Sequence, residues 1–280
     1  MNIEIKRTVK AGNSSAVILP RAWLNQEVRV ELIKKTPEII LKEVLDVAKN
    51  YIDTEKIIGI YLVGSYARNE EEKDSDIDVL IVSDNVNRKE IKIGIYSIMI
   101  ISWSLLEWKL ENDLFPIGPM IIEAKPLINS FSFSIMKERV NVTKKNVKWY
   151  IETTKERLRL IKEILNIARK KVDDRTTYTI VLRIRTLKMI QSMTKNRVYP
   201  KKHLIELLKK ISGSNNAYEA YTSIKNGLKN ENKTTKGEAE KLYEYLENQL
   251  EVTKKIVKYQ GLSYFLKNSI TNSNTDKFYC

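Results

Sequence analysis

The sequence predicts a multidomain α+β protein with a small β unit at the N-terminus, an α/β core and an all-α C-terminal part. Short runs that alternate polar and apolar residues fill the first 35 positions. Longer apolar, β-branched runs separated by turns continue to about residue 130, and helical periodicity dominates after that. We therefore divide the chain into residues 1–35, 36–130 and 131–272, followed by a polar tail at 273–280.

Composition excludes several classes of protein. The chain has 280 residues, of which 42% are hydrophobic, so it is long enough for more than one buried core. One cysteine, Cys280, and one histidine, His203, provide neither a disulfide framework nor a Cys/His zinc site. The sequence shows no basic-then-apolar leader and no apolar run of about 18 residues. We expect a cytoplasmic protein with no membrane partner.

Charge is distributed unevenly along the chain. The net charge is +14, yet residues 1–130 hold 17 Lys/Arg against 20 Asp/Glu, and residues 131–280 hold 32 against 15. A strongly basic half favours a polyanionic partner such as RNA, DNA or a charged nucleotide. A solvated, Lys-rich helical surface explains the same excess, and composition alone does not choose between the two.

The first 35 residues predict three short strands, at Asn2–Val9, Ser15–Leu19 and Glu27–Ile33. A Gly-Asn-Ser turn signal separates the first two strands, and Pro20 suits the first position of a short helical turn. Because so small a unit buries little apolar surface by itself, we expect it to need a second copy.

The run from Thr8 to Leu24, closing on Glu27–Val30, resembles the AbrB/SpoVT swapped-hairpin family, most closely its short archaeal, transposon-associated members. The Gly-Asn-Ser turn, the apolar-Leu-Pro step and the last alternating strand occur in the family's order. The resemblance implies an obligate homodimer of interlaced hairpins whose basic residues contact DNA or a toxin partner. The alternative is a dimerisation clamp with solubilising charges. The residues placed for DNA contact are Lys6, Arg7, Lys10 and Arg21.

The second segment alternates helices and strands as a small α/β domain does. Pro37–Ile52 has a helical period, whereas Lys56–Val63 and Asp76–Ser83 are apolar runs typical of buried strands. We expect a third strand over Glu90–Ser102, a helix from Leu105 and a closing segment over Met120–Ile128.

Two motifs in this segment carry the chemistry. Gly64-Ser65 follows an apolar strand, where a residue without a Cβ lets backbone N–H groups approach a phosphate. Residues 66–69 can form the first turn of a helix that faces the same anion. After ten intervening residues come Asp76 and Asp78, which an extended strand would direct to one face. Paired carboxylates beside a phosphate site suit a hard divalent cation shared with a nucleotide.

This Gly-Ser…Asp-x-Asp arrangement resembles the polymerase-β-like nucleotidyltransferase superfamily over about residues 38–130, most closely its minimal archaeal and bacterial members. The resemblance implies transfer of a nucleoside monophosphate from a nucleoside triphosphate (NTP) to an acceptor, with release of pyrophosphate. Asp76 and Asp78 would be catalytic and hold two Mg²⁺ ions, and Gly64 and Ser65 would bind the β- and γ-phosphates. Arg68 would neutralise the leaving group, or else form a surface ion pair with Glu70 or Glu71.

Two positions depart from that family's pattern. Asn69 stands where the family usually has glycine, a mild change because asparagine tolerates positive φ. Ser97 falls where active members carry a third carboxylate, and a serine hydroxyl provides neither a general base nor an anionic ligand. Either Glu90, Glu123 or a substrate group replaces that carboxylate, or catalysis is weak or lost.

The basic C-terminal part predicts amphipathic helices. We expect a helical domain that walls the active-site cleft and whose excess of Lys and Arg suits an RNA acceptor. The sequence around Tyr218–Gly227 loosely resembles the helical companion of many such nucleotidyltransferases. The expected helices are Val147–Ala168, Thr176–Met193, Lys202–Ile211 and Lys236–Lys258.

Two functions follow from these features. The first is a Mg²⁺-dependent nucleotidyltransferase that modifies a hydroxyl of RNA, protein or a small molecule. The second is a nucleotide-binding, DNA-binding regulator or antitoxin-like protein whose transferase fold is catalytically weakened. Asp76 and Asp78 favour the first function, and Ser97 favours the second.

Overall fold

The structure, a computed structural model, describes residues 6, 8–30, 35–71, 75–228 and 231–272, the side chains of residues 89 and 260–272 excepted. The chain forms two compact units, Met1–Thr36 and Pro37–Cys280. Each unit is described by itself below.

The first unit contains an antiparallel hairpin of β1 (Thr8–Ala11) and β2 (Ser14–Val17), followed by a 3₁₀ turn, η1 (Arg21–Trp23). Gly12 has a φ of +60° in the hairpin turn, a conformation that glycine adopts without strain. The strand expected from Glu27 onward is not formed over residues 27–30, and 31–34 lie outside the described residues. A strand needs a hydrogen-bonded neighbour, and among the described residues of this unit β1 and β2 pair with each other and with no third strand.

The second unit is built on a mixed five-stranded sheet with the order β5-β6-β4-β3-β7. Strand β4 runs parallel to β6, and the other neighbouring pairs are antiparallel. The α+β class predicted for this segment is therefore confirmed. The five strands are β3 (Ile57–Val63), β4 (Ile77–Ser83), β5 (Arg88–Ile93), β6 (Tyr96–Ser102) and β7 (Lys125–Ile128).

The single strand predicted over Glu90–Ser102 is wrong, because this segment is the hairpin of β5 and β6. Gly94, with a φ of +59°, turns the chain between them. The isoleucines on both sides of the turn form an almost unbroken apolar run, which hid the turn in the sequence. As a result Glu90 lies beside β6 and not at the start of the same strand.

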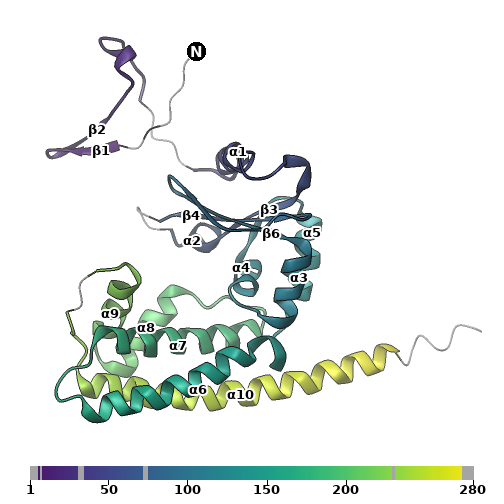
Figure 1. Ribbon diagram of the computed structural model, residues 1–280, viewed down its shortest axis with the longest axis vertical. Coiled ribbons are helices and arrows are strands. Elements are labelled where there is room, and N and C mark those ends of the chain that lie inside the picture. Colours follow the sequence, from purple (N-terminus) through teal and green to yellow (C-terminus); the bar gives the residue numbers. More distant parts are fainter. Residues whose placement is uncertain (1–5, 7, 31–34, 72–74, 229–230, 273–280) are drawn as a thin grey trace, which may run out of the picture. The chain divides into compact units, whose positions relative to one another are not determined.

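Alternate side chains of the sheet enter two apolar layers. Ile60 and Ile81 pack with Ile40 and Val44 of α1 (Pro37–Ala48), while Tyr61, Leu80 and similar side chains point to the opposite face. Helix α1 covers one face of the sheet, and further helices cover the other face (Figure 1). These helices are α3 (Trp103–Asn112), α4 (Ile117–Glu123) and α5 (Ser130–Arg139).

The remaining long helices continue the layer below the sheet (Figure 1). Their buried side chains form one apolar cluster with Leu80 of β4 and Ile117 of α4. They are α6 (Lys144–Ile167), α7 (Asp174–Met193), α8 (Lys201–Ser212), α9 (Asn216–Lys225) and α10 (Lys236–Asn272). Two shorter helices, η2 (Thr54–Lys56) and α2 (Gly64–Arg68), flank β3. Within the described ranges, none of these helices has the length and apolar character that a membrane span requires.

Candidate active site

Gly64 links the end of β3 to the start of α2, and its geometry disfavours any larger residue. Its φ is +71°, and a Cβ built on it would lie 2.2 Å from Oδ2 of Asp78. The two strands place these residues together because Val63 pairs with Asp78. A glycine at this position therefore allows both the turn and the close approach of the Asp78 carboxylate.

Asp78 lies in β4 and is half-buried, whereas Asp76 precedes the strand, which begins at Ile77, and is exposed. Burial raises the pKa of the Asp78 carboxyl above its usual value, and the negative charges of Asp76 and Glu123 raise it further. The positive charges of Arg68 and Lys225 oppose that shift. The two aspartates thus lie close enough to interact in an environment that favours a cation.

The backbone N–H of Gly64, beside Asp78, already donates a hydrogen bond to the carboxylate of Glu123. Glu123, the last residue of α4, accepts a hydrogen bond of 2.8 Å from the Gly64 N–H and forms an ion pair of 2.5 Å with Arg68 Nη1. The N–H of Gly64 and the guanidinium of Arg68 thus converge on one carboxylate, and we call these two groups the cradle.

Arg68 also forms a 2.8 Å ion pair with Glu70. Glu70 is one of the two partners that the sequence predicted for a surface ion pair of Arg68. Burial disfavours its charge, yet hydrogen bonds and ion pairs with Glu70 and Glu123 outweigh burial and raise the Arg68 pKa. The Arg68 side chain is 24% exposed, so its guanidinium stays beside Glu123 and does not extend into solvent.

The short helix α2, which carries Arg68, also carries Ser65 and is followed by Asn69. Ser65 is its second residue and is partly buried. Asn69 ends the helix in the left-handed region with a φ of 55°, as expected for a residue that replaces glycine there. Its side-chain oxygen accepts a 2.8 Å hydrogen bond from Lys125, which ties α2 to β7.

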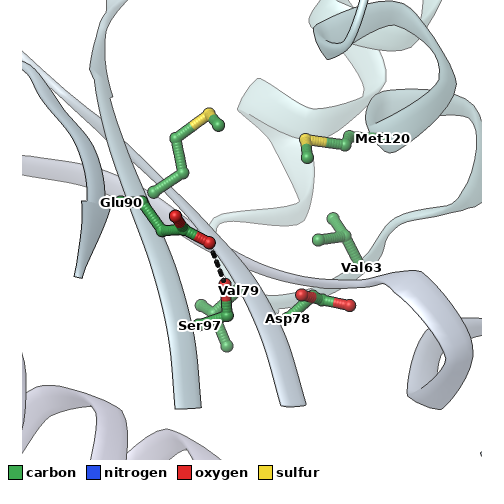
Figure 2. Close-up of a pocket in the computed structure, with 7 residues that line it drawn as sticks. Val63, Asp78, Val79, Glu90, Ser97 and Met120 are labelled. Carbon is green, nitrogen blue, oxygen red and sulfur yellow. Dashed lines mark hydrogen bonds between the residues drawn. The ribbon is translucent and has the colours of Figure 1, made fainter. Parts of the chain in front are cut away.

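Ser97 lies directly beside Asp78 in the parallel register of β4 and β6. Its hydroxyl donates a hydrogen bond of 3.4 Å to Glu90 of β5. Figure 2 shows Glu90 and Ser97 joined by this bond, with Asp78 on the neighbouring strand. These three residues, with Val63, Val79, Met99 and Met120, line a hollow of about 280 Å³.

The other residues singled out in the sequence lie elsewhere or outside the described parts. Lys6, Lys10 and Arg21 are exposed residues of the first unit, and Arg7 lies outside the described residues. Sequence reasoning missed Lys225, an exposed residue at the end of α9 whose charge acts on Asp78. No local motif marks it, because the folding of a distant helix brings it there.

The family model for the nucleotidyltransferase domain matches residues 41–199, which is more than half of the chain. The protein therefore belongs to the nucleotidyltransferase domain family. The match confirms the polymerase-β-like part of the resemblance and extends it beyond the end of α7.

Two solved structures are similar to this chain. A nucleotidyltransferase-like protein from Exiguobacterium sibiricum is 11% identical, with a TM-score of 0.37, over 81% of this chain and 80% of that one. The spectinomycin adenyltransferase from Enterococcus faecialis, solved with ATP and spectinomycin, is 12% identical, with a TM-score of 0.38, over 75% of this chain and 98% of that one. No curated protein matches the chain.

Proposed function

We propose that the protein transfers a nucleoside monophosphate from an NTP to a hydroxyl acceptor and releases pyrophosphate. The observation that carries this proposal is the grouping of the Gly64 N–H, Arg68 and Asp78 around the carboxylate of Glu123. An anion-binding cradle next to a half-buried aspartate is the arrangement that metal-assisted transfer from a triphosphate requires. The family match supports the same chemistry.

Asp76 and Asp78 are the residues that would hold Mg²⁺. Among the described residues, no three or more Asp, Glu, His or Cys side chains are grouped as a complete metal site. This donor set fits Mg²⁺, which usually binds one or two carboxylates together with water and substrate phosphates. The negative charge around Asp78 is the electrostatic reason for a cation there. When bound, two Mg²⁺ ions would neutralise the phosphates and lower the pKa of the acceptor hydroxyl.

The cradle would bind the β- and γ-phosphates. The Gly64 N–H and the Ser65 hydroxyl would donate to phosphate oxygens, and Arg68 would neutralise the charge of the leaving pyrophosphate. In this proposal, a phosphate oxygen of the NTP replaces the Glu123 carboxylate as the acceptor of the hydrogen bond from the Gly64 N–H. Lys225 adds a positive charge from the helical side of the site.

The acceptor is a hydroxyl of RNA, protein or a small molecule. The excess of 32 Lys/Arg over 15 Asp/Glu in residues 131–280 favours RNA, because a basic surface attracts the phosphate backbone. Helices α6–α10, which carry most of this charge, share an apolar cluster with the face of the sheet that carries Leu80. Asp78 projects to that same face, two residues before Leu80.

Transfer is tested by incubating the protein and Mg²⁺ with each of the four NTPs, labelled at the α-phosphate, in the presence of total RNA, protein or small hydroxyl compounds. We expect labelling of one acceptor class, lost in the double variant Asp76→Ala/Asp78→Ala. Asp46→Ala is the matched control, because Asp46 is an exposed carboxylate on α1. Equal labelling by the double variant and the wild type would show that these aspartates are not catalytic.

We further infer that the first unit is an AbrB/SpoVT-like hairpin that dimerises. None of its described residues is buried, and Ile18, Leu24 and Val30 are 69%, 71% and 68% exposed. Apolar side chains exposed to this degree on a small unit favour association with a second copy. Deletion of residues 1–36 should convert a dimer to a monomer in sedimentation or light-scattering measurements. A deletion variant that is still a dimer refutes the inference.

DNA is the proposed partner of the same unit, bound through Lys6, Arg7, Lys10 and Arg21. Lys6, Lys10 and Arg21 are exposed in the described part of this unit. Each phosphate contact contributes to the salt dependence of binding. Lys10→Glu should weaken duplex binding and reduce the dependence of log K on log salt concentration by about 1. Unaltered binding would remove this surface from the proposal.

A second candidate function is a nucleotide-binding, DNA-binding regulator or antitoxin-like protein with weakened transferase activity. The register that places the neutral hydroxyl of Ser97 beside Asp78 favours it. This candidate predicts nucleotide binding that alters DNA affinity, without transfer of label. The labelling screen separates the two functions, because only the first gives a covalently modified acceptor.

A further inference from the structure

We propose that Glu90, on the edge strand β5, accepts the proton of the attacking hydroxyl. Glu90 then replaces, from a neighbouring strand, the carboxylate that the family resemblance leads one to expect at Ser97. The inference rests on the proposed transfer reaction, and it assigns a catalytic residue within the same site.

The order of the strands gives Asp78 two distinct sides. The cradle, with Gly64 and Arg68, lies where β3 meets α2 on one side of β4, and Ser97 and Glu90 lie on β6 and β5 on the other. In phosphoryl transfer the attacking and leaving oxygens are roughly in line, on opposite sides of the phosphorus. Because the pyrophosphate leaves on the cradle side, the hydroxyl arrives on the side of Ser97.

The hollow on that side is suited to an acceptor hydroxyl. Its carboxylates are those of Asp78 and Glu90, and apolar side chains such as Met99 and Met120 form much of the rest (Figure 2). The side chain of Glu90 is 54% exposed, so an incoming acceptor can reach it. The hydrogen bond from Ser97 joins the Glu90 carboxylate to β6, the strand beside the one that carries Asp78.

Glu123, the other carboxylate considered for this role, lies on the wrong side of Asp78. One of its oxygens accepts from the Gly64 N–H and the other is paired with Arg68, both in the cradle. A proton acceptor there would face the leaving group and not the nucleophile. The only partners described for the Glu90 carboxylate are the Ser97 hydroxyl and an exposed ion pair of 3.3 Å with Lys92. Exposed pairs of this kind are weak and allow the side chain to move.

In the proposed step, the acceptor oxygen forms a bond to the α-phosphorus of the NTP. The bond between that phosphorus and the oxygen of the β-phosphate breaks, and pyrophosphate leaves with the electron pair. The proton of the acceptor hydroxyl passes to an Oε atom of Glu90. Ser97 donates a hydrogen bond of 3.4 Å to the same carboxylate.

The test compares four proteins with one labelled NTP and its acceptor: the wild type, Glu90→Gln, Glu90→Gln/Ser97→Glu, and Glu111→Gln. Glu111 is an exposed residue of α3 outside the site and serves as the matched control. We expect Glu90→Gln to lower kcat by about a hundredfold or more, the usual contribution of general base catalysis, with the KM for the NTP unchanged. The carboxylate that Ser97→Glu introduces should restore the kcat of the double variant to at least a tenth of the wild-type value. Glu111→Gln should have the same kcat as the wild type.

A binding measurement without turnover completes the test. Mn²⁺ is titrated into each protein, and its binding is followed by electron paramagnetic resonance. We expect Glu90→Gln to bind Mn²⁺ as tightly as the wild type does. We expect Asp78→Asn to lose the Mn²⁺ site. A Glu90→Gln variant that keeps its rate, or that loses Mn²⁺ binding with its rate, overturns the assignment of Glu90 as proton acceptor. A wild type that transfers no label to any acceptor refutes the proposed function itself, and Glu90 with it.

Discussion

The two sides of Asp78 differ in how their charges are organised. On the cradle side, Gly64, Arg68 and Glu123 form a compact, partly buried network with hydrogen bonds as short as 2.5 Å. On the acceptor side, Ser97 and Glu90 are joined by one exposed hydrogen bond of 3.4 Å. In the proposed reaction, the side that binds the nucleotide would therefore be organised before the substrate arrives, whereas the side that receives the acceptor is open.

Among the variants that compare the two sides of Asp78, the largest effect should come from Gly64→Ala, which alters the cradle side. Alanine at a φ of +71° is strained, and its Cβ would displace the carboxylate of Asp78. We expect transfer to fall by about a hundredfold, the effect of small misplacements at a catalytic centre. Gly213→Ala is the control, since Gly213 has a φ of +87° with no atom near its missing Cβ. If both variants lose activity equally, general instability explains the loss and the close approach to Asp78 does not.

Glu123→Gln should have the next largest effect, in the opposite direction. The Glu123 carboxylate competes with phosphate for the Gly64 N–H and adds negative charge beside Asp78. A charge-assisted hydrogen bond contributes about 1.5 kcal/mol, so removing this competitor should tighten NTP binding by about tenfold. Calorimetric titration with a non-hydrolysable NTP measures the change. Weaker binding would show instead that Glu123 holds Arg68 in place for the phosphate.

Asp78→Asn should stabilise the metal-free protein at neutral pH. The pKa of Asp78 is raised in the folded state, so its contribution to stability is full below the unfolded pKa and is lost as the pH rises through the folded pKa. The variant should therefore melt about 2 °C higher than the wild type at pH 7. The gap should close as the pH falls toward the usual pKa of an unperturbed aspartate, about 4. A lower melting temperature at pH 7 would contradict the charge imbalance described for this site.

Ser97→Ala should have the smallest effect and tests the acceptor side. The hydroxyl makes one long, exposed hydrogen bond to Glu90, which contributes little to orientation. We expect kcat to change by about twofold, since such a bond is worth at most about 0.5 kcal/mol. A hundredfold loss would show that Ser97 itself takes part in the reaction and that the two sides are equally organised.

Much of the site could be predicted from the sequence because its signals are local. The glycine after β3 and the two aspartates around the start of β4 depend on strand ends and on positive φ, which short motifs report. The position of Ser97 was also predicted, and the register with Asp78 agrees with it. The first unit was predicted less well, because a third strand over residues 27–30 has no described neighbour with which to pair.

The sequence by itself determined the mixed α+β class of the core, the glycine turn, the aspartate pair and the absence of a carboxylate at position 97. Only the tertiary structure decided which charges surround them. The contact from Gly64 to Glu123 spans 59 residues, and the turn at Gly94 folds β5 back so that Glu90 lies beside Ser97. The physical reason is that side-chain periodicity fixes the local conformation of a strand, whereas the packing of the whole sheet and its helices selects the partner that lies beside it.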